Sequence, residues 1–505
     1  MGIRSILAKP FAAFIAAETK RWSREPEVHQ AKIMEHLVDQ ARHTAFGKDH
    51  SFDSIKDYDS FKKNIPVRDY EDLKPYIERV VAGEPDILWK GKPKYLAKTS
   101  GTTSGTKYIP ITKDSVSSHF TNSRNAVLSY VHETGKSAFL DGNIIFLSGS
   151  PELDEKAGIK TGRLSGISNH EIPPIWRTNQ KPSYVTNCIE DWEEKLEKII
   201  DETLHANMTL ISGIPPWAQM YFDHIQARTG KKIKDVFPNF SMFVYGGVNF
   251  EPYRAKLFET IGKKIDSIET YPASEGFIAY QDSQTEQGLL LLLNSGIFFE
   301  FIPTDEYFID SPTRLSIEEV ELGKNYALII NSNAGLWGYS IGDTIKFVSK
   351  NPYRIVVTGR IKHFISAFGE HVIGEEVEKA MKFTMEKFPG VELVEFTVAP
   401  QVTPTEGLPH HEWFIEFAKA PDNLSTFGAE LDNHLRKLNV YYDDLIMGNI
   451  LQTLKIIRLQ KNGFIDYMKS QGKLGGQNKV PRLSNDRKIA GELVKFVIKD
   501  STGAF

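Results

Sequence analysis

Apolar positions in the first ninety residues recur every three to four residues. This spacing places them along one face of a helix, which a globular protein usually turns toward its core. The segment before residue 22 carries such a face, whose members are Ile3, Ile6, Leu7, Phe11, Phe14 and Ile15. A second face follows, formed by Ile33, Leu37, Val38 and Ala41. We therefore predict a helical N-terminal region whose first helix docks through its apolar stripe.

From about residue 95 onward, short apolar runs alternate with amphipathic segments. The runs at 143–147, 240–245 and 327–331 have the length and continuity of buried strands. Between them, the segment 190–206 carries an apolar face at helical spacing. Such alternation of strands and helices is typical of an α/β protein.

The pattern changes after about residue 362. The predicted elements there are a helix at 373–388, strands at 391–399 and 411–419, a helix at 424–437 and a strand at 449–459. The proline-rich stretch 399–410 is interpreted as the loop between two of these strands. We predict two domains: a large N-terminal domain with α/β sheets over residues 1–361, and a smaller C-terminal α+β domain over residues 362–505.

Composition narrows the class of protein. The chain has 505 residues, 41% hydrophobic and 25% charged, which fits a globular protein with more than one core. The net charge is −4 and neither sign forms a long block, so no nucleic-acid partner is expected. Cys188 is the one cysteine, which favours a reducing, cytoplasmic location. A secretion signal is not favoured, no apolar run reaches membrane-spanning length, and no membrane partner is expected.

The stretch Lys98–Lys107 concentrates small hydroxyl residues and two glycines between two lysines. Glycines let successive backbone N–H groups converge on an anion, and a lysine adds a point charge for phosphates. The spacing is not that of a Walker A motif, because Gly101 and Gly105 are too close together and Lys107 does not follow the second glycine directly. A flexible Ser/Thr/Gly linker is the alternative interpretation.

Further candidate chemistry lies at predicted strand ends and turns. The stretches concerned are Tyr245–Asn249, Glu269–Gly276 and Gly335–Asp343. In Tyr245–Asn249, backbone without side chains could lie against a flat nucleotide base. In Glu269–Gly276, Tyr271 could stack on a ring and the Glu275 carboxylate could bind Mg²⁺. Asp343 follows a predicted glycine turn and is suited to bind ribose hydroxyls. Ligands gather at the carboxyl ends of strands in α/β sheets, which is where we expect these loops.

In this order, the stretches resemble the adenylate-forming superfamily of acyl-CoA synthetases, luciferases and nonribosomal-peptide adenylation domains. More narrowly, the motifs at Tyr271–Gly276 and Gln477–Arg482 are similar to those of the auxin-responsive promoter (Gretchen Hagen 3) family of acyl-acid amido synthetases. The resemblance runs from about residue 95 to residue 482. It implies a ligase that uses ATP and Mg²⁺ to form an acyl-adenylate from a carboxylic acid, then transfers the acyl group to an amine, in particular an amino acid. It also implies a mobile C-terminal domain with its hinge at Lys362.

The resemblance implies a role for each matching residue. Lys479, Glu275 and Lys107 are the implied catalytic residues, with Glu275 as the metal ligand and Lys479 reaching the phosphate during activation. The residues implied to hold ATP are Thr99, Ser100, Gly101, Thr102, Thr103, Ser104, Gly105, Gly246, Gly247, Tyr271, Pro272, Ala273, Ser274, Asp343 and Arg360.

The sequence departs from the family pattern in places. Lys107 has the lysine spacing of the wider superfamily rather than that of the plant family, and Ser340 stands where the third motif usually has arginine. Taken without their surroundings, Asp343 fits a turn residue, Glu275 a surface carboxylate and Arg360 a member of an ion pair.

The remaining histidines and the cysteine have simpler interpretations. The run His410–Glu412 lacks the second histidine of H-E-x-x-H, and we expect it to face solvent or the edge of the core. His119, His363 and His371 are expected to be structural histidines with satisfied hydrogen bonds. Cys188 has no activating base in the sequence and is expected to be a buried thiol.

Three functions remain open at this point. An acyl-acid amido synthetase is the leading interpretation, an acyl-CoA ligase shares its first half-reaction, and a nucleotide-binding protein without catalysis is the third. The acyl pocket is expected to draw on the helix after Lys113 and on residues 149–176, including Pro173, Pro174 and Trp176. The sequence does not identify the acid, the acceptor or the oligomeric state.

Overall fold

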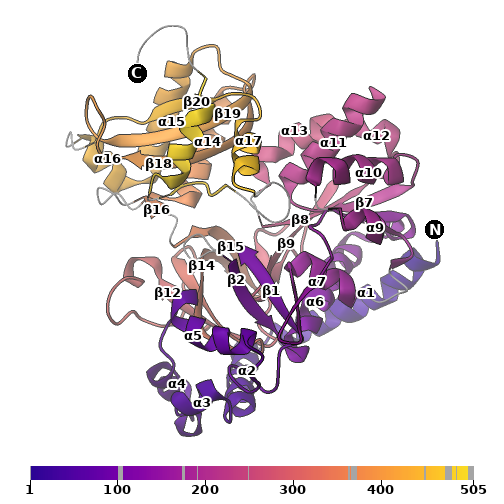
Figure 1. The fold of residues 1–505 in the computed structure, drawn as a ribbon, viewed down its shortest axis with the longest axis vertical. Coiled ribbons are helices and arrows are strands. Elements are labelled where there is room, and N and C mark those ends of the chain that lie inside the picture. Colours follow the sequence, from indigo (N-terminus) through magenta and orange to yellow (C-terminus); the bar gives the residue numbers. More distant parts are fainter. Residues whose placement is uncertain are drawn as a thin grey trace. The chain divides into compact units, whose positions relative to one another are not determined.

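The computed structural model divides the chain into two compact units (Figure 1). The first comprises Met1–Asn249 and Leu257–Val357, and the second comprises Phe250–Lys256 and Thr358–Phe505. The structure describes residues 2–100, 106–172, 177–189, 191–247, 250–361, 364–365, 372–447, 451–472, 480–484 and 486–498.

The N-terminal region is helical, as predicted. Its helices are α1 (Ile3–Trp22), α2 (Pro26–Ala41), α3 (Ala45–Asp49), α4 (Tyr58–Asn64) and α5 (Tyr70–Val81). The predicted contact face of α1 is wrong, however, because Ile15 is the one member of the apolar stripe that is buried. The face that packs on α6 (Lys113–Thr134) instead carries Ser5, Ala8 and Ala12. Small side chains allow the two helix backbones to approach closely, so they occupy the contact.

The core of the first unit is an eleven-stranded mixed sheet in the order β12-β13-β14-β15-β11-β10-β9-β8-β7-β3-β6. Its strands are β3 (Asn143–Phe146), β6 (Gln180–Lys181), β7 (Met208–Ser212), β8 (Met242–Gly246), β9 (Asp266–Ala273), β10 (Gly276–Tyr280), β11 (Leu289–Leu291), β12 (Ile297–Pro303), β13 (Asn325–Ser332), β14 (Leu336–Lys350) and β15 (Tyr353–Arg360). From β6 to β9 neighbouring strands run parallel, whereas β10 pairs antiparallel with both β9 and β11. The predicted strands at 143–147, 240–245 and 327–331 are confirmed, and the α/β class with them.

Helices connect the parallel strands. The connections contain α7 (Leu164–Glu171), α9 (Tyr184–Asn187), α10 (Trp192–Thr203), α11 (Pro215–Thr229) and α12 (Ile233–Val236). Helices α10, α11 and α12 lie together beside the parallel strands (Figure 1). Because parallel strands end at the same edge, the segments that follow β8 and β9 emerge side by side.

A smaller four-stranded sheet, ordered β2-β1-β5-β4, carries the predicted phosphate loop. Its strands are β1 (Tyr95–Ser100), β2 (Thr106–Ile111), β4 (Asp154–Lys156) and β5 (Ile159–Gly162). Strands β1 and β2 form an antiparallel hairpin in which Thr99 pairs with Lys107 and Ser100 with Thr106. The hairpin ends are therefore held in fixed register on both sides of residues 101–105.

A buried ion cluster holds β12 to the N-terminal helices. The Arg314 guanidinium binds Glu300 through two hydrogen bonds, Nε to Oε1 at 2.9 Å and a terminal nitrogen to Oε2 at 2.7 Å. Tyr58 donates to Glu300 Oε1 at 3.0 Å, and Asn331 donates to Oε2 at 2.9 Å. The Glu300 side chain is fully buried, and both of its oxygens accept hydrogen bonds. Asn331 also accepts the backbone N–H of Gly338 at 2.6 Å, which ties the cluster to β14.

The second unit has the predicted α+β pattern. Its main elements are α14 (Gly374–Lys387), β18 (Glu392–Gln401), β19 (His410–Lys419), α15 (Leu424–Leu438), α16 (Val440–Met447), β20 (Lys455–Leu459), α17 (Gly463–Ser470) and α18 (Lys488–Leu493). Strand β19 pairs antiparallel with β18 and parallel with β20. Strand β20 begins later than predicted, because α16 follows α15 in the sequence before it.

His410 and His411 are buried at the start of β19, so of the two expected positions, solvent or the edge of the core, the first is wrong. The His411 ring stacks on Tyr442 with centroids 5.0 Å apart. The amide of Gln452 lies 2.8 Å from His410 Nδ1. Both histidines therefore belong to the packing of the second unit.

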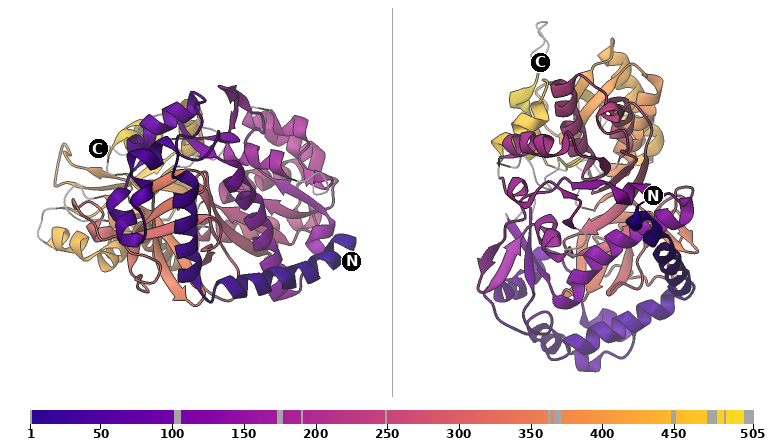
Figure 2. Two further views of the ribbon diagram at one scale, coloured as in Figure 1. Left: turned by 90° about the horizontal axis from the view of Figure 1, so that it is seen from below. Right: turned by 90° about the vertical axis from the view of Figure 1, so that its right-hand side faces the viewer.

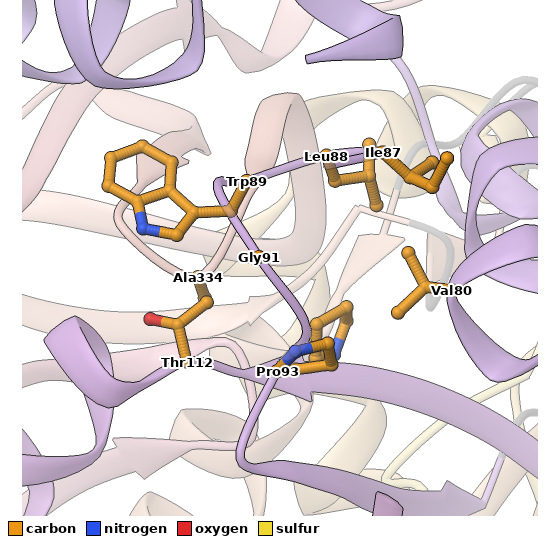
Figure 3. A pocket seen from close by; sticks show the side chains of 9 residues that line it. Val80, Ile87, Leu88, Trp89, Gly91, Pro93, Thr112 and Ala334 are labelled. Atoms are coloured by element: carbon orange, nitrogen blue, oxygen red, sulfur yellow. The ribbon is translucent and has the colours of Figure 1, made fainter. Parts of the chain in front are cut away.

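A small apolar cavity of about 10 Å³ lies in the first unit (Figure 3). Its lining includes Val80, Leu88, Trp89 and Pro110. A space of this size holds about one water molecule, so the cavity cannot receive a nucleotide. Among the described residues, no helix is long and apolar enough to cross a membrane.

Candidate active site

Two predicted nucleotide-binding residues meet directly. The Tyr271 hydroxyl on β9 donates to Asp343 Oδ2 on β14 at 2.5 Å. Three strands separate β9 from β14 in the sheet order, so the sheet must curl to bring the two side chains together. Tyr271 is buried and Asp343 is half-buried. The motifs predicted to bind adenine and ribose therefore converge on one place.

The glycines after β8 are required by close packing. A Cβ on Gly246 would lie 2.4 Å from the Thr270 carbonyl oxygen, closer than any side chain could tolerate. Thr270 also donates its hydroxyl to the Tyr245 carbonyl at 2.9 Å. Gly247 has a φ of +77°, which favours glycine. Bare backbone thus passes close to the end of β9, while Val248 and Asn249 lie outside the described residues.

The turn between β9 and β10 presents the predicted metal ligand. Ser274 and Glu275 form this turn, with Ser274 buried and Glu275 half-buried. Pro272 is exposed and Ala273 half-buried on the strand just before it. The Glu275 carboxylate is therefore held at the strand end where the sequence predicted it. Among the described residues, no group of three or more His, Cys, Asp or Glu side chains forms a metal cluster.

Lys107 has a defined environment on β2. Its ammonium lies 5.0 Å from the centroid of the Tyr70 ring, a distance typical of a cation–π contact. The Tyr70 hydroxyl in turn accepts the backbone N–H of Tyr108 at 2.9 Å, and burial raises the pKa of that hydroxyl. Helix α5 thus braces the strand that carries Lys107. The loop from Gly101 to Gly105 lies outside the described residues.

Asp343 lies within β14, so the predicted glycine turn at this place is wrong. The strand runs from Leu336 to Lys350 and tolerates irregular backbone at glycines, with Gly342 at a φ of +80°. The departure at Ser340 also has a structural account, because its hydroxyl accepts a hydrogen bond from Tyr307 at 2.9 Å. Asp343 is consequently positioned by strand pairing and by Tyr271, not by a turn.

The predicted residues of the C-terminal region are only partly described. Arg360 is exposed at the last position of β15. Lys362 and Lys479 lie outside the described residues, as do His363 and His371.

The chain directly after Lys479 is firmly held. Thr397 donates its hydroxyl to the Pro481 carbonyl at 2.6 Å, and Val398 exchanges backbone hydrogen bonds of 2.9 Å with Arg482 and Ser484. The Arg482 guanidinium forms ion pairs with Glu378 and Glu395. The segment that follows the predicted lysine is thus anchored to β18.

Sequence reasoning missed Lys195 on α10. Its side chain is buried, and its ammonium donates to the Ser148 carbonyl at 3.0 Å and to the Asn187 carbonyl at 2.7 Å. Burial lowers the pKa of this ammonium to about 8. Lys195 therefore fixes the segment that follows β3, where ligands gather in such sheets. The sequence signal for a buried Lys195 was its position directly before Leu196, on the apolar side of an amphipathic helix.

His119 on α6 was expected to have satisfied hydrogen bonds, but the structure shows otherwise. The residue is buried, and its Nδ1 has no hydrogen-bond partner among the described residues. Burial lowers the pKa of the imidazole to about 4, so the ring is neutral at pH 7. Cys188 is half-buried rather than buried, and desolvation raises the pKa of its thiol. A thiol in this state is not activated as a nucleophile.

Comparisons with known proteins agree with this geometry. The GH3 family N-terminal domain matches residues 16–180 and 147–265, the GH3 family central domain matches residues 290–360, and the GH3 family C-terminal domain matches residues 375–488. A jasmonoyl-L-amino acid synthetase, GH3.5 of Oryza sativa subsp. japonica, is 24% identical over 514 residues, covering 85% of this chain and 87% of the relative.

Solved structures share the fold. The AtGH3.15 acyl acid amido synthetase in complex with 2,4-DB superimposes with a TM-score of 0.80 at 16% identity, covering 97% of this chain and 96% of that one. A 2-hydroxyisobutyryl-CoA ligase in its postadenylation state superimposes with a TM-score of 0.55 at 13% identity, covering 95% and 90% of the two chains.

The family match places the chain among ATP-dependent, adenylate-forming ligases. Within that class, the three matched domains cover most of the sequence from residue 16 to residue 488. The chain belongs to the GH3 family of acyl-acid amido synthetases.

Proposed function

We propose that this protein activates a carboxylic acid with ATP and couples it to the amine of an amino acid. In the first step, a carboxylate oxygen attacks the α-phosphorus of ATP, forming an acyl-adenylate and releasing pyrophosphate. In the second step, the amine nitrogen attacks the acyl carbonyl carbon, AMP leaves, and the nitrogen loses a proton. The hydrogen bond between Tyr271 and Asp343 carries this proposal, because it joins two separate motifs of the family at one place.

The described residues supply positioning and charge rather than a covalent nucleophile. Asp343 would accept hydrogen bonds from the ribose hydroxyls, and its bond to Tyr271 would hold it in place. The glycine backbone at Gly246 and Gly247 would lie against adenine, beside Tyr271. The hairpin of Thr99 and Lys107 would bring the loop 101–105 to the phosphates. Preorganised donors and cations of this kind stabilise the charge that develops on phosphate during attack.

Glu275 is the residue we propose as the Mg²⁺ ligand. Mg²⁺ is commonly bound by one or two carboxylates together with substrate phosphates, so a single carboxylate held at a strand end suits it. When bound, the ion would neutralise phosphate charge. The turn is short, because it consists of the buried Ser274 and the half-buried Glu275 between the paired Ala273 and Gly276.

The two predicted domains, residues 1–361 and 362–505, divide the work in this proposal. Lys479 would approach the α-phosphate during activation and withdraw when the amine enters, with Lys362 as the hinge. The anchoring of Pro481, Arg482 and Ser484 on β18 supports this role, since it ties the chain that follows Lys479 to the second unit. Arg360 would assist in binding the ribose.

The acyl pocket is proposed to draw on α6 and on the segment that follows β3. On α6, the buried His119 has a ring nitrogen with no hydrogen-bond partner in the described part of the chain, and Lys195 binds the Ser148 carbonyl. The residues Pro173, Pro174 and Trp176, predicted to join this pocket, lie outside the described residues. We place the reaction in the cytoplasm, where ATP and amino acids are available.

Product mass tests the proposed function. Acid-dependent ATP–pyrophosphate exchange would be screened over aryl, fatty and keto acids, and the active acid then offered with amino acids or with coenzyme A. We expect an amide of an amino acid. A thioester as the sole product would replace the proposal with an acyl-CoA ligase, and ATP binding without exchange for any acid would refute catalysis.

The role of Lys479 has a separate test. Lys479→Ala should slow acid-dependent exchange by about a hundredfold or more while leaving ATP affinity within about threefold, because the lysine is proposed to act on the transition state. Lys461→Ala, which removes an exposed lysine of the same unit, is the matched control. Exchange at the wild-type rate in Lys479→Ala would remove this residue from the mechanism.

A further inference from the structure

Helix α1 exposes an apolar stripe. Ile3 is 77% exposed, Ile6 55%, Leu7 64%, Phe11 39% and Phe14 57%. The rings of Phe11 and Phe14 stack with centroids 6.4 Å apart, so the stripe is continuous. Figure 2 shows α1 as a long helix at the edge of the first unit, ending at the N-terminus. A contiguous apolar face of this kind marks an interaction surface.

Within residues 3–15 the charged side chains of α1 are basic. With 3.6 residues per turn, Lys9 lies at one edge of the stripe and Arg4 at the other, where Arg4 also donates to the Thr178 hydroxyl at 2.6 Å. The Arg124 guanidinium from α6 lies 5.0 Å from the centroid of the Phe11 ring. Glu18 lies on the same face two turns after Phe11, and its charge is balanced by Arg21 at 2.6 Å.

One other carboxylate is close to the start of the helix. Asp141 accepts the backbone N–H groups of Gly2 at 2.5 Å and Ser5 at 3.1 Å. These two bonds place Asp141 on the Ser5 side of the helix, which faces the protein, rather than on the apolar stripe. The stripe is thus bordered by cations.

We propose that this face of α1 docks on the surface of an anionic phospholipid bilayer. An amphipathic helix with aromatic and aliphatic side chains between basic residues lies in the plane of the headgroups, with its apolar side chains inserted and its cations near lipid phosphates. The expectation of no membrane partner rested on the lack of a membrane-spanning run, which does not exclude docking on a membrane surface. The structure, in addition, turns the apolar stripe of α1 outward.

A second copy of the chain fits this face less well. Stable protein interfaces take about 20–30 residues from each partner, whereas the stripe offers five large side chains along about 18 Å of helix. Pairing two such faces would also bring Lys9 and Arg4 of each copy toward those of the other. A negatively charged surface gains from the same cations. The match to the family model begins at residue 16, after the whole stripe.

Vesicle co-sedimentation tests the proposal. The full-length protein would be mixed with vesicles of phosphatidylcholine alone, and with vesicles of equal parts phosphatidylcholine and phosphatidylserine. We expect binding to the mixed vesicles that exceeds binding to the neutral ones by about tenfold or more, since each basic residue near the surface adds attraction. Leu7→Ser with Phe14→Ser should lower binding to the mixed vesicles by about tenfold or more, because the inserted apolar area is lost.

Matched variants separate a specific surface from general stickiness. Phe308→Ser with Ile309→Ser removes two side chains that are 63% and 53% exposed elsewhere in the first unit, and should leave binding unchanged. Lys9→Glu should reduce binding to the mixed vesicles, whereas Lys231→Glu, outside α1, should not. Melting temperatures would verify that each variant is folded.

Absence of wild-type binding to the mixed vesicles would overturn the proposal, as would equal losses in the Phe308/Ile309 control. Light scattering after size-exclusion chromatography tests the alternative, in which the stripe binds a second copy of the chain. If the wild type is a dimer that does not bind vesicles, and Leu7→Ser with Phe14→Ser makes it a monomer, the face belongs to a dimer interface. Because the test uses no acid or amine substrate, its result is independent of the proposed function.

Discussion

Two of the tyrosine–carboxylate pairs on the main sheet differ in their surroundings. Tyr58 donates to Glu300 at 3.0 Å, where the carboxylate is fully buried and also bound by Arg314 and Asn331. Tyr271 donates to Asp343 at 2.5 Å, where the aspartate is half-buried within β14. The first pair has its carboxylate oxygens bound by protein donors in the core. The second is partly exposed, so solvent or a ligand can reach the residue.

The comparison teaches how to separate structural from functional carboxylates. A buried carboxylate needs its charge balanced and its oxygens hydrogen-bonded, so Glu300 serves stability. Asp343 is half-buried, so solvent can stabilise part of its charge. The two sites are connected, because Asn331 bonds both Glu300 and the backbone of Gly338 on β14. We expect substitutions at the first site to change stability and substitutions at the second to change ATP use.

The largest effect should follow from Arg314→Met. This change removes the cation and leaves the Glu300 charge buried without its balance, which costs about 3–5 kcal/mol of unfolding free energy. Urea denaturation would measure it. Arg354→Met, which breaks the better-exposed pair of Arg354 with Asp282, serves as the control and should cost less. A loss under about 1 kcal/mol in Arg314→Met would contradict the structural assignment.

Asp343→Asn should have a smaller effect, and one of another kind. The amide keeps a hydrogen-bond acceptor for Tyr271 but removes the charge proposed to bind ribose. The loss of a charged hydrogen bond is worth about 2–3 kcal/mol, so ATP-dependent exchange should fall about 30- to 150-fold in kcat/KM. The urea midpoint should stay near the wild-type value. If Asp343→Asn shows normal exchange and reduced stability, Asp343 is a structural carboxylate like Glu300.

His119 extends the comparison to a buried ring whose Nδ1 has no hydrogen-bond partner among the residues that the structure describes. Its folded pKa of about 4 lies below the ordinary value of 6.5, so the unfolded state binds more protons between these values. Stability contributed by this residue is present above pH 6.5 and is lost as the pH falls toward 4. Relative to His119→Asn, the wild type should lose about 2 kcal/mol of unfolding free energy between pH 8 and pH 5. Parallel pH profiles for the two proteins would contradict the buried, neutral state.

The smallest effects should come from deleting each tyrosine hydroxyl. Tyr58→Phe should cost about 1 kcal/mol of stability, because Glu300 retains Arg314 and Asn331. Tyr271→Phe should leave stability nearly unchanged and weaken ATP binding by about fivefold, because Asp343 loses the group that orients it. Calorimetric ATP titration and urea denaturation on both variants would distinguish the pairs. If both variants change stability and ATP binding equally, the two pairs do not differ in role.

The sequence predicted the elements of the fold better than their contacts. Buried strands such as β3 and β8 could be located because short, continuous apolar runs between turn signals usually form buried strands. The pairing of Tyr271 with Asp343 could not, since it spans 72 residues and depends on the curl of the sheet. The motif Gly335–Asp343 suggested a turn just before Asp343. Gly335 does lie in a turn, but Gly338 and Gly342 permit irregular backbone inside the long strand that follows.

Helix α1 illustrates the same limit. The helical spacing of its apolar residues was evident in the sequence. That spacing alone does not determine which face of the helix is buried. The small residues Ser5, Ala8 and Ala12 form the contact because α1 packs closely on α6, while the large residues stay outside. Lys195 was missed for a related reason, as a lysine is predicted to face water unless its backbone acceptors, the carbonyls of Ser148 and Asn187, are known.

The fate of the carboxylate oxygen tests the central claim most directly. The active acid, labelled with oxygen-18 in both carboxylate positions, would be converted with ATP and the amino acid acceptor, and the products weighed by mass spectrometry. If the acid oxygen attacks the α-phosphorus, AMP must carry one heavy oxygen and the amide must retain one. ADP with labelled phosphate, or AMP without the label, would contradict acyl-adenylate formation.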